Sequence, residues 1–167
     1  MLVSCFVAAV ANISMPELLF TCLEFEQLSN TDLYELLRLR SAVFVVEQDC
    51  VFLDTDGLDA QAMHLLGKVD GELVAYARLL PGRLKYEGVS IGRVVTSEAV
   101  RRSGHGRQLM AEAVARCRQL WPDQPIIISA QQYLEKFYQG FGFKTVSDPY
   151  LEDDIYHLEM HLAPGQE

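Results

Sequence analysis

The most informative stretch of the chain reads Arg93-Val94-Val95-Thr96-Ser97-Glu98-Ala99-Val100-Arg101-Arg102-Ser103-Gly104-His105-Gly106. It begins inside a β-rich run, residues 89–96, and ends where a helical pattern begins. That pattern covers residues 104–121, where apolar side chains recur at i, i+3 and i+4. A helix N-terminus carries unpaired N–H groups and about half a positive charge. Because the turn before it contains two glycines and two arginines, the stretch predicts a site for a phosphate or pyrophosphate.

Other phosphate-binding loops fit this stretch less well. A dinucleotide-binding loop would need a third glycine at position 109, which is Leu109. A nucleoside-triphosphate loop would need Gly-Lys-Ser or Gly-Lys-Thr, which the sequence lacks. On glycine spacing alone, a helix start whose glycines only turn the chain stays an open alternative.

The remaining periodic segments extend this strand-turn-helix unit into an α/β (α+β) fold. Strands are expected at residues 23–27, 64–69, 72–80, 89–96, 126–130, 143–146 and 155–162, with helices from residue 30, over 104–121 and over 133–138. Asp70-Gly71 is expected to close a two-residue hairpin, because both residues tolerate a positive φ. The order β-α-β-β-β-α-β-α-β-β predicts a mixed central sheet of about six to seven strands flanked by helices.

Length and charge narrow the classes of function. A chain of 167 residues is expected to form one domain. Lys and Arg number 14 against 23 Asp and Glu, a net charge of −9, so we expect no nucleic-acid partner. Cys5, Cys22, Cys50 and Cys117 form no CxxC pair, which indicates reduced, buried thiols, no structural metal and a cytoplasmic protein.

The first residues form an apolar stretch that differs from the rest of the chain. Residues 2–13 are too short for a bilayer span, which needs about 20 residues, so we expect no membrane partner. They also lack the basic residue that opens a secretory signal. We expect residues 1–14 to be a dispensable or mis-started extension and residues 15–167 to be the single domain; a signal peptide is the alternative.

Several motifs together resemble one known family. The spacing Arg-x-x-Gly-x-Gly between a strand and a long helix resembles the acetyl-CoA loop of the GCN5-related N-acetyltransferase (GNAT) superfamily. Four further stretches look like its ElaA-like subgroup: Val43-Phe44-Val45-Val46-Glu47-Gln48, Ile91-Gly92-Arg93-Val94-Val95, Ala130-Gln131 and Phe137-Tyr138-Gln139-Gly140-Phe141-Gly142-Phe143. The resemblance covers residues 20–162 in order.

This resemblance implies the GNAT acyl-CoA N-acyltransferase fold, with acetyl-CoA as co-substrate and no metal. Main-chain groups of Val94, Val95 and Thr96 would pair with the pantetheine arm, as an added strand pairs with a sheet edge. Gln131 would occupy the polar position at the end of its strand. The amides that would surround the pyrophosphate belong to Arg101, Arg102, Ser103, Gly104, His105 and Gly106.

The resemblance further implies transfer of an acetyl group to a primary amine by direct attack. Tyr138 matches the family tyrosine near the thioester sulfur, and a core aromatic is its alternative role. Glu47 is a candidate general base, or a solvated helix end. The acceptor is a small-molecule or peptide amine, and a homodimer is compatible with the fold. Two other functions are considered. The chain could be a non-catalytic acyl-CoA-binding or regulatory module, or it could bind another phosphorylated ligand.

Other polar residues carry weaker hypotheses. His157 is expected on the polar face of its strand, with a base role as the alternative; Asp154 and Tyr156 depart there from the subgroup's Glu-Asp-Gly-Ile-Pro-His pattern. His64 is expected to be a strand residue rather than a ligand. The acidic stretch 54–59 is expected to be a solvated loop, with an edge of the acceptor site as the alternative. A calcium loop centred there lacks oxygen ligands at both ends.

Overall fold

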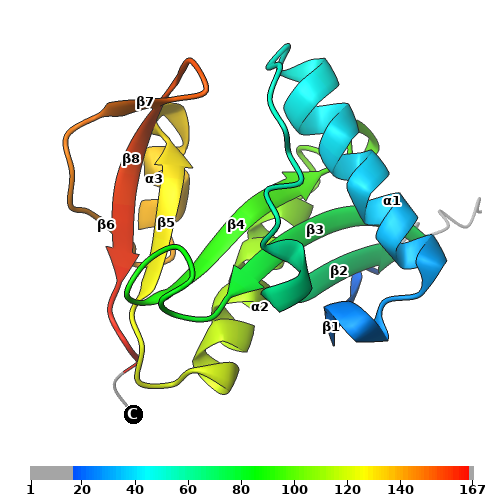
Figure 1. Ribbon diagram of the computed structural model, residues 1–167, viewed down its shortest axis with the longest axis horizontal. Coiled ribbons are helices and arrows are strands. Elements are labelled where there is room, and N and C mark those ends of the chain that lie inside the picture. The colour runs from blue at the N-terminus through cyan, green and yellow to red at the C-terminus, as the bar shows by residue number, and fades with distance from the viewer. Residues whose placement is uncertain (1–16, 166–167) are drawn as a thin grey trace, which may run out of the picture.

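The computed structural model describes residues 17–165, which form one mixed sheet with helices on both faces (Figure 1). Its strands are β1 (Leu19–Glu24), β2 (Met63–Val69), β3 (Glu72–Leu80), β4 (Val89–Thr96), β5 (Ile126–Gln131), β6 (Lys144–Thr145), β7 (Tyr150–Glu152) and β8 (Ile155–Leu162). Its α-helices are α1 (Asn30–Arg40), α2 (His105–Leu120) and α3 (Glu135–Gln139). A π-helical segment, Ser41–Glu47, continues α1, and short 3-10 turns occupy Phe25–Gln27, Asp59–Gln61, Glu98–Val100 and Gln132–Leu134.

The sheet has two parts that meet at one short parallel contact. Strands β1 to β4 pair antiparallel in chain order, and β5 pairs antiparallel with β8, whose other edge carries β6 and β7. Between the parts, β4 and β5 pair only through Val89 with Ile126 and Ser90 with Ile127. Beyond these pairs the two strands separate, as Figure 1 shows. The predicted fold class, a mixed sheet flanked by helices, is confirmed.

Alternating side chains of the first part build a core on each face of the sheet. In β3, Ala75, Ala77 and Leu79 are fully buried in the cluster that includes the apolar face of α2. Tyr76 points to the opposite face and packs in the cluster with Leu36 of α1. Because successive side chains of a strand point to opposite faces of the sheet, β3 contributes to the hydrophobic core on both faces. Helix α1 leads into the π-helical segment and α2 follows the loop after β4, so both helices adjoin the β4 side of the site described below.

The boundaries of helices and strands agree with those predicted from the sequence where turn residues or a hydrophobic periodicity mark them. Strands β3, β4 and β8 have the predicted limits, and the hairpin turn has the expected positive φ at Asp70 and Gly71. Ser29 caps α1 by accepting the Asp32 amide.

The first and the seventh strands correct the prediction. β1 begins earlier than predicted and ends at Glu24, because it pairs with β2 and because Glu24 and Gln27 then form a capping box that turns the chain. β7 was absent from the predicted order, which raises the strand count to eight.

Two expectations concern the chain as a whole. Cys117 is buried as predicted, but Cys22 and Cys50 are only partly buried; all three are free thiols. The expected extension 1–14 lies outside the described residues. Within residues 17–165, no helix has the length and apolar character that a membrane span requires.

Candidate active site

A cavity of about 450 Å³ opens where β4 and β5 separate. Its walls come from both halves of the molecule: β4, β5, the π-helical segment, α3, the β3–β4 loop and the β7–β8 hairpin. π-helical turns are rare and often occur at functional sites. Here the segment places Val43, Phe44 and Glu47 on the cavity wall.

A bulge in β4 shapes the wall on that side. Tyr76 pairs with Val95 and Arg78 with Gly92, so Arg93 and Val94 together face the single residue Ala77. Arg93 takes a positive φ of 51° there. Bulges bend a strand and raise its twist. Beyond Ser90, β4 has no partner strand on its β5 side among the described residues, so this edge is open to an extended ligand.

The predicted phosphate loop lies at the end of β4 and leads directly into α2. Gly104 caps the helix with φ 89°, and a Cβ at Gly104 or Gly106 would meet no atom within 4 Å. The amides of Arg107 and Gln108 both donate to the Gly104 carbonyl, so the helix begins with the N–H groups of His105 and Gly106. The loop backbone is therefore accessible to an anion.

Side chains of the loop are engaged in different ways. The Ser103 hydroxyl donates to the Val100 carbonyl at 2.5 Å and also contacts His105 Nδ1. Because that hydroxyl hydrogen is used, His105 must be the donor to Ser103. Arg102 is exposed. The loop thus offers main-chain donors and one exposed guanidinium group.

Arg101 joins this loop to the π-helical segment. Its guanidinium group donates to both Glu47 carboxylate oxygens, at 2.5 and 2.7 Å, and lies 3.4 Å from the Thr96 carbonyl. The hydrogen bonds from Arg101 lower the pKa of Glu47. A carboxylate held in this way is a weak proton acceptor.

Two further predicted residues line the cavity from its other wall. Tyr138 of α3 is only 8% exposed, packs edge-on against Phe137 and Phe143, and burial raises its pKa to about 12. It therefore carries its proton at neutral pH. Gln131 ends β5, accepts a hydrogen bond from the Tyr133 hydroxyl at 2.6 Å and donates to Gln48 at 3.4 Å, which spans the two walls.

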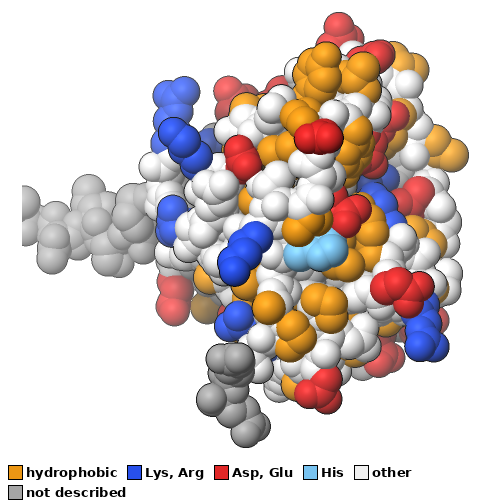
Figure 2. Space-filling model, turned by 90° about the vertical axis from the view of Figure 1, so that its left-hand side faces the viewer, with side chains coloured by type: hydrophobic (Ala, Val, Ile, Leu, Met, Phe, Trp, Pro, Cys, Tyr) orange, Lys and Arg blue, Asp and Glu red, His pale blue; other side chains and the backbone are white. Residues whose placement is uncertain are grey.

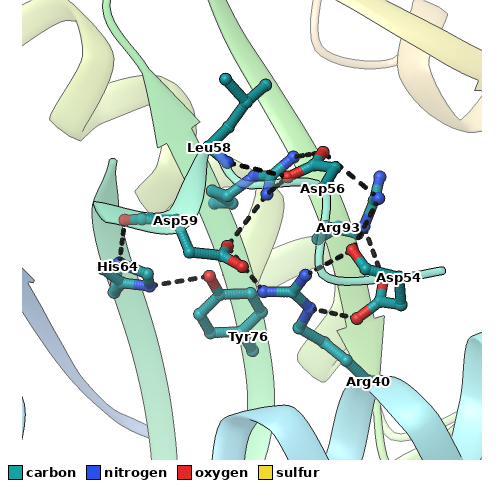
Figure 3. A network of polar contacts seen from close by, with 9 residues as sticks. Arg40, Asp54, Asp56, Leu58, Asp59, His64, Tyr76 and Arg93 are labelled. Atoms are coloured by element: carbon teal, nitrogen blue, oxygen red, sulfur yellow. Dashed lines mark hydrogen bonds and ion pairs between the residues drawn. The ribbon is translucent and has the colours of Figure 1, made fainter. Parts of the chain in front are cut away.

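The three carboxylates of the acidic stretch 54–59 are held in a network of ion pairs, so the expectation of a loop of freely solvated acids was wrong, although Thr55, Asp56 and Gly57 are exposed (Figure 3). Asp54 is 6% exposed and binds Arg40 at 2.8 Å and Arg93 at 2.7 Å. Arg78, 2% exposed, binds Asp56 at 2.6 Å and Asp59 at 2.9 Å. The network ties the loop to the bulge of β4, and so supports the cavity wall.

Burial and ion pairing act in opposite directions within this network. Burial alone would raise the pKa of Asp59, but hydrogen bonds from Arg40 and Arg78 outweigh it and the pKa is lowered. Asp56 follows the same pattern, with Arg78 as its main partner. His64 is buried beside the network; desolvation lowers its pKa, and its ring contacts the Tyr76 hydroxyl and the Asp59 carbonyl. It is a structural residue, as predicted.

A polar group that the sequence analysis did not single out lies on the β7–β8 side of the cavity. Ser129 of β5 bonds to the Tyr150 hydroxyl at 2.6 Å and to Glu152 at 2.5 Å. Glu152 and His157 both line the cavity. Their signal was the partial match of residues 152–157 to the subgroup pattern, in which both residues are retained. Among the described residues, no group of three or more His, Cys, Asp or Glu side chains has the arrangement of a metal site.

Comparison with known proteins agrees with this architecture. The family described as "Acetyltransferase (GNAT) domain" matches residues 53–164. The protein ElaA of Escherichia coli (strain K12) is 48% identical over 140 residues, which are 83% of this chain and 92% of that protein.

Solved structures of similar proteins indicate the same family. An acyl-CoA N-acyltransferase from Pseudomonas aeruginosa superposes with a TM-score of 0.82 at 45% identity, covering 86% of this chain and 99% of that one. The crystal structure of Escherichia coli ElaA gives the same score and identity, covering 87% and 99%. The chain therefore belongs to the GNAT acetyltransferase family and is an ElaA-like acyltransferase.

Proposed function

We propose that this acyltransferase moves an acetyl group from acetyl-CoA to a primary amine by direct attack. One observation carries the proposal: β4 and β5 separate beyond Ser90, and the open edge leads to the N-terminus of α2. A cofactor with an extended amide-containing arm and a diphosphate requires both features. The unpaired strand edge can bind the amides of the arm, and the accessible N–H groups can bind the phosphates.

The donor would bind along β4. Main-chain groups of Val94, Val95 and Thr96 would pair with the pantetheine arm, and the amides of residues 101–106 would bind the pyrophosphate. The accessible backbone at Gly104 and Gly106 supports this, because an anion can approach it closely. Arg101 already bonds to the Thr96 carbonyl, so we assign its side chain to shaping the loop.

Tyr138 would donate a hydrogen bond to the leaving thiolate. Its buried position on the cavity wall and its raised pKa support this role, because the hydroxyl stays protonated while the sulfur gains charge. Gln131, which reaches from β5 toward Gln48, would line the path between donor and acceptor.

The acceptor amine must lose a proton before it can attack. A lysine-like amine has a pKa of ~10.4, so its free base costs roughly 4.6 kcal/mol at pH 7. Glu47 was the predicted base, but its pairing with Arg101 favours a positioning role for this residue. A cavity of about 450 Å³ has the size of a small-molecule pocket, which supports a small-molecule amine or the amine of a short peptide as the acceptor. A homodimer and a cytoplasmic location stay predictions of the sequence.

Free thiol release tests this function. The purified chain is incubated with acetyl-CoA and a panel of amino acids, polyamines, peptide N-termini and alkylamines, and products are identified by mass spectrometry. Amine-dependent thiol release with an acetylated product is expected. Binding of acetyl-CoA without turnover on any amine would support a binding module instead, and no binding would contradict the proposal.

A further inference from the structure

The β7–β8 side of the cavity contains a hydrogen-bonded chain with a defined direction. An ionised carboxylate only accepts hydrogen bonds, so the Ser129 hydroxyl donates to Glu152 at 2.5 Å. That hydroxyl has one hydrogen, and therefore the Tyr150 hydroxyl must donate to Ser129, at 2.6 Å. The chain ends on the Oε2 atom of Glu152 and fixes the orientation of its carboxylate.

The second oxygen of Glu152, Oε1, accepts no hydrogen bond among the described residues. It forms a long ion pair with Lys85, whose Nζ lies 3.7 Å away, beyond hydrogen-bond distance, and whose side chain is 37% exposed. Burial would raise the pKa of Glu152, but the hydrogen bond from Ser129 and the charges of Lys85 and Arg93 outweigh it and lower the pKa. A half-buried carboxylate that stays ionised suits a cationic ligand.

His157 lies next to this carboxylate with one ring nitrogen free. Its Nδ1 is 2.9 Å from the Ile155 carbonyl, which can only accept, so Nδ1 carries the hydrogen. In the neutral ring the lone pair is then on Nε2. The ring is stacked on Tyr150 with centroids 6.3 Å apart, which restricts its rotation.

The β7–β8 hairpin adds negative charge at the cavity. Asp153 lines the cavity, and Asp153 and Asp154 form the turn, both with positive φ. Hydrophobic side chains gather near the top of this side of the molecule, with acidic side chains among them (Figure 2). Leu151 and Tyr156 of the hairpin are 61% and 57% exposed. The net charge of −9 attracts cations to such a site.

We propose that Glu152 and His157 form the acceptor subsite, in which Glu152 Oε1 binds the ammonium group of a cationic alkylamine and His157 Nε2 removes its proton. The inference rests on the proposed function and deepens it, because it names the acceptor class and the base. The amine nitrogen then forms the C–N bond, the C–S bond breaks, and its electron pair goes to sulfur. Of the two protons that the ammonium ion loses, one ends on sulfur and one leaves to solvent.

Two variants separate the roles. Glu152→Gln keeps an oxygen for Ser129 but removes the charge. His157→Asn keeps a donor near the Ile155 carbonyl but removes the Nε2 lone pair. His161→Asn is the matched control, because His161 lies further along β8, pairs with Glu159 at 2.7 Å and is absent from the cavity wall. Each variant is first compared with the parent chain for melting temperature and acetyl-CoA affinity.

Kinetics are measured with two kinds of acceptor: 1,5-diaminopentane and phenethylamine, which are cations at neutral pH, and 4-methoxyaniline, which is neutral there. Glu152→Gln is expected to raise KM for the cations about 10- to 100-fold and to leave KM for the aryl amine unchanged. His157→Asn is expected to lower kcat with the cations about 10²- to 10⁴-fold. Its effect on the neutral amine is expected to be far smaller, because no ammonium proton must be removed.

The possible results separate the inference from the proposed function. Equal losses on both kinds of amine would overturn the inference, as would a variant effect no larger than that of His161→Asn. If the parent chain binds acetyl-CoA but acetylates neither cation, the acceptor class is wrong while the cofactor site stands. If acetyl-CoA does not bind, the proposed function fails and the inference fails with it.

Discussion

Tyr138 and Glu47, the two side chains predicted to be catalytic, differ in what surrounds them. Tyr138 is buried by aromatic neighbours and faces the cavity, which keeps its hydroxyl protonated. Glu47 is a half-exposed carboxylate bound at both oxygens by one arginine. The same cavity therefore contains a hydrogen-bond donor and a carboxylate whose two oxygens each accept a hydrogen bond from Arg101.

Removing the Tyr138 hydroxyl tests its role. Tyr138→Phe keeps the ring packing, so the fold and the affinity for acetyl-CoA are expected to change little. If the hydroxyl stabilises the departing thiolate, kcat falls about 10²-fold or more. Thiol release measures kcat, and Tyr34→Phe, an exposed position on α1, is the control. A kcat within about twofold of the parent would leave Tyr138 as a core aromatic.

Glu47→Gln separates a positioning role from a base role. The substitution weakens a partly exposed ion pair, so acetyl-CoA affinity is expected to fall about two- to fivefold through the loosened Arg101, with kcat unchanged. Calorimetry gives the affinity and thiol release gives kcat. A large drop in kcat at unchanged affinity would instead make Glu47 the base.

At the scale of elements, the start of α2 decides donor binding. Gly104→Ala places a side chain on a backbone with φ 89°, where L-residues are strained by about 1–2 kcal/mol. The relaxed loop no longer presents the same N–H groups, so acetyl-CoA affinity is expected to fall about tenfold or more, a change measured by calorimetry.

Gly71→Ala is the matched control for this element. Gly71 has φ 86° in the β2–β3 hairpin and, like Gly104, has open space where the methyl group of an alanine would lie. Its substitution is expected to lower the melting temperature comparably but to leave acetyl-CoA affinity unchanged. Equal loss of affinity in both variants would show that strain alone, and not the loop, explains the effect of Gly104→Ala.

How far the sequence predicted these elements depends on how local each signal is. Residues 101–106 and the strands around them carry their own turn residues and hydrophobic periods, and the structure has them as predicted. Glu152 is different, because its place in the cavity depends on the pairing of β7 with β8, which brings its carboxylate to Ser129 of β5. Likewise Asp54 and Asp56 look like a solvated loop until three arginines from distant elements surround them. Contacts across the sheet have no local pattern in the sequence.

At the scale of the whole molecule, the ion-paired carboxylates of residues 54–59 link stability to pH. The pKa values of Asp56 and Asp59 are lowered in the folded state, so the stabilisation that they give is fully present above their unfolded values of ~3.9. It is lost as pH falls toward the folded values. Urea unfolding at a series of pH values is expected to show a free energy of unfolding that declines steeply below about pH 4.

Asp59→Asn identifies the source of this decline. The variant is expected to be less stable at neutral pH, because Arg40 and Arg78 lose a charged partner, and to show a shallower loss of stability in acid. Asp123→Asn, at an exposed position after α2, is the control and is expected to keep the parent slope. An unchanged slope in Asp59→Asn would assign the acid sensitivity to other carboxyl groups.

The proposed function depends most on a ligand that binds between the open edge of β4 and the first turn of α2. Hydrogen exchange measured with and without saturating acetyl-CoA tests that location directly, because pairing of an amide slows its exchange. Slower exchange is expected in residues 91–106, with no change in the β2–β3 hairpin, residues 63–72. Unchanged exchange over residues 91–106, or protection confined to another part of the chain, would contradict a donor site at this edge.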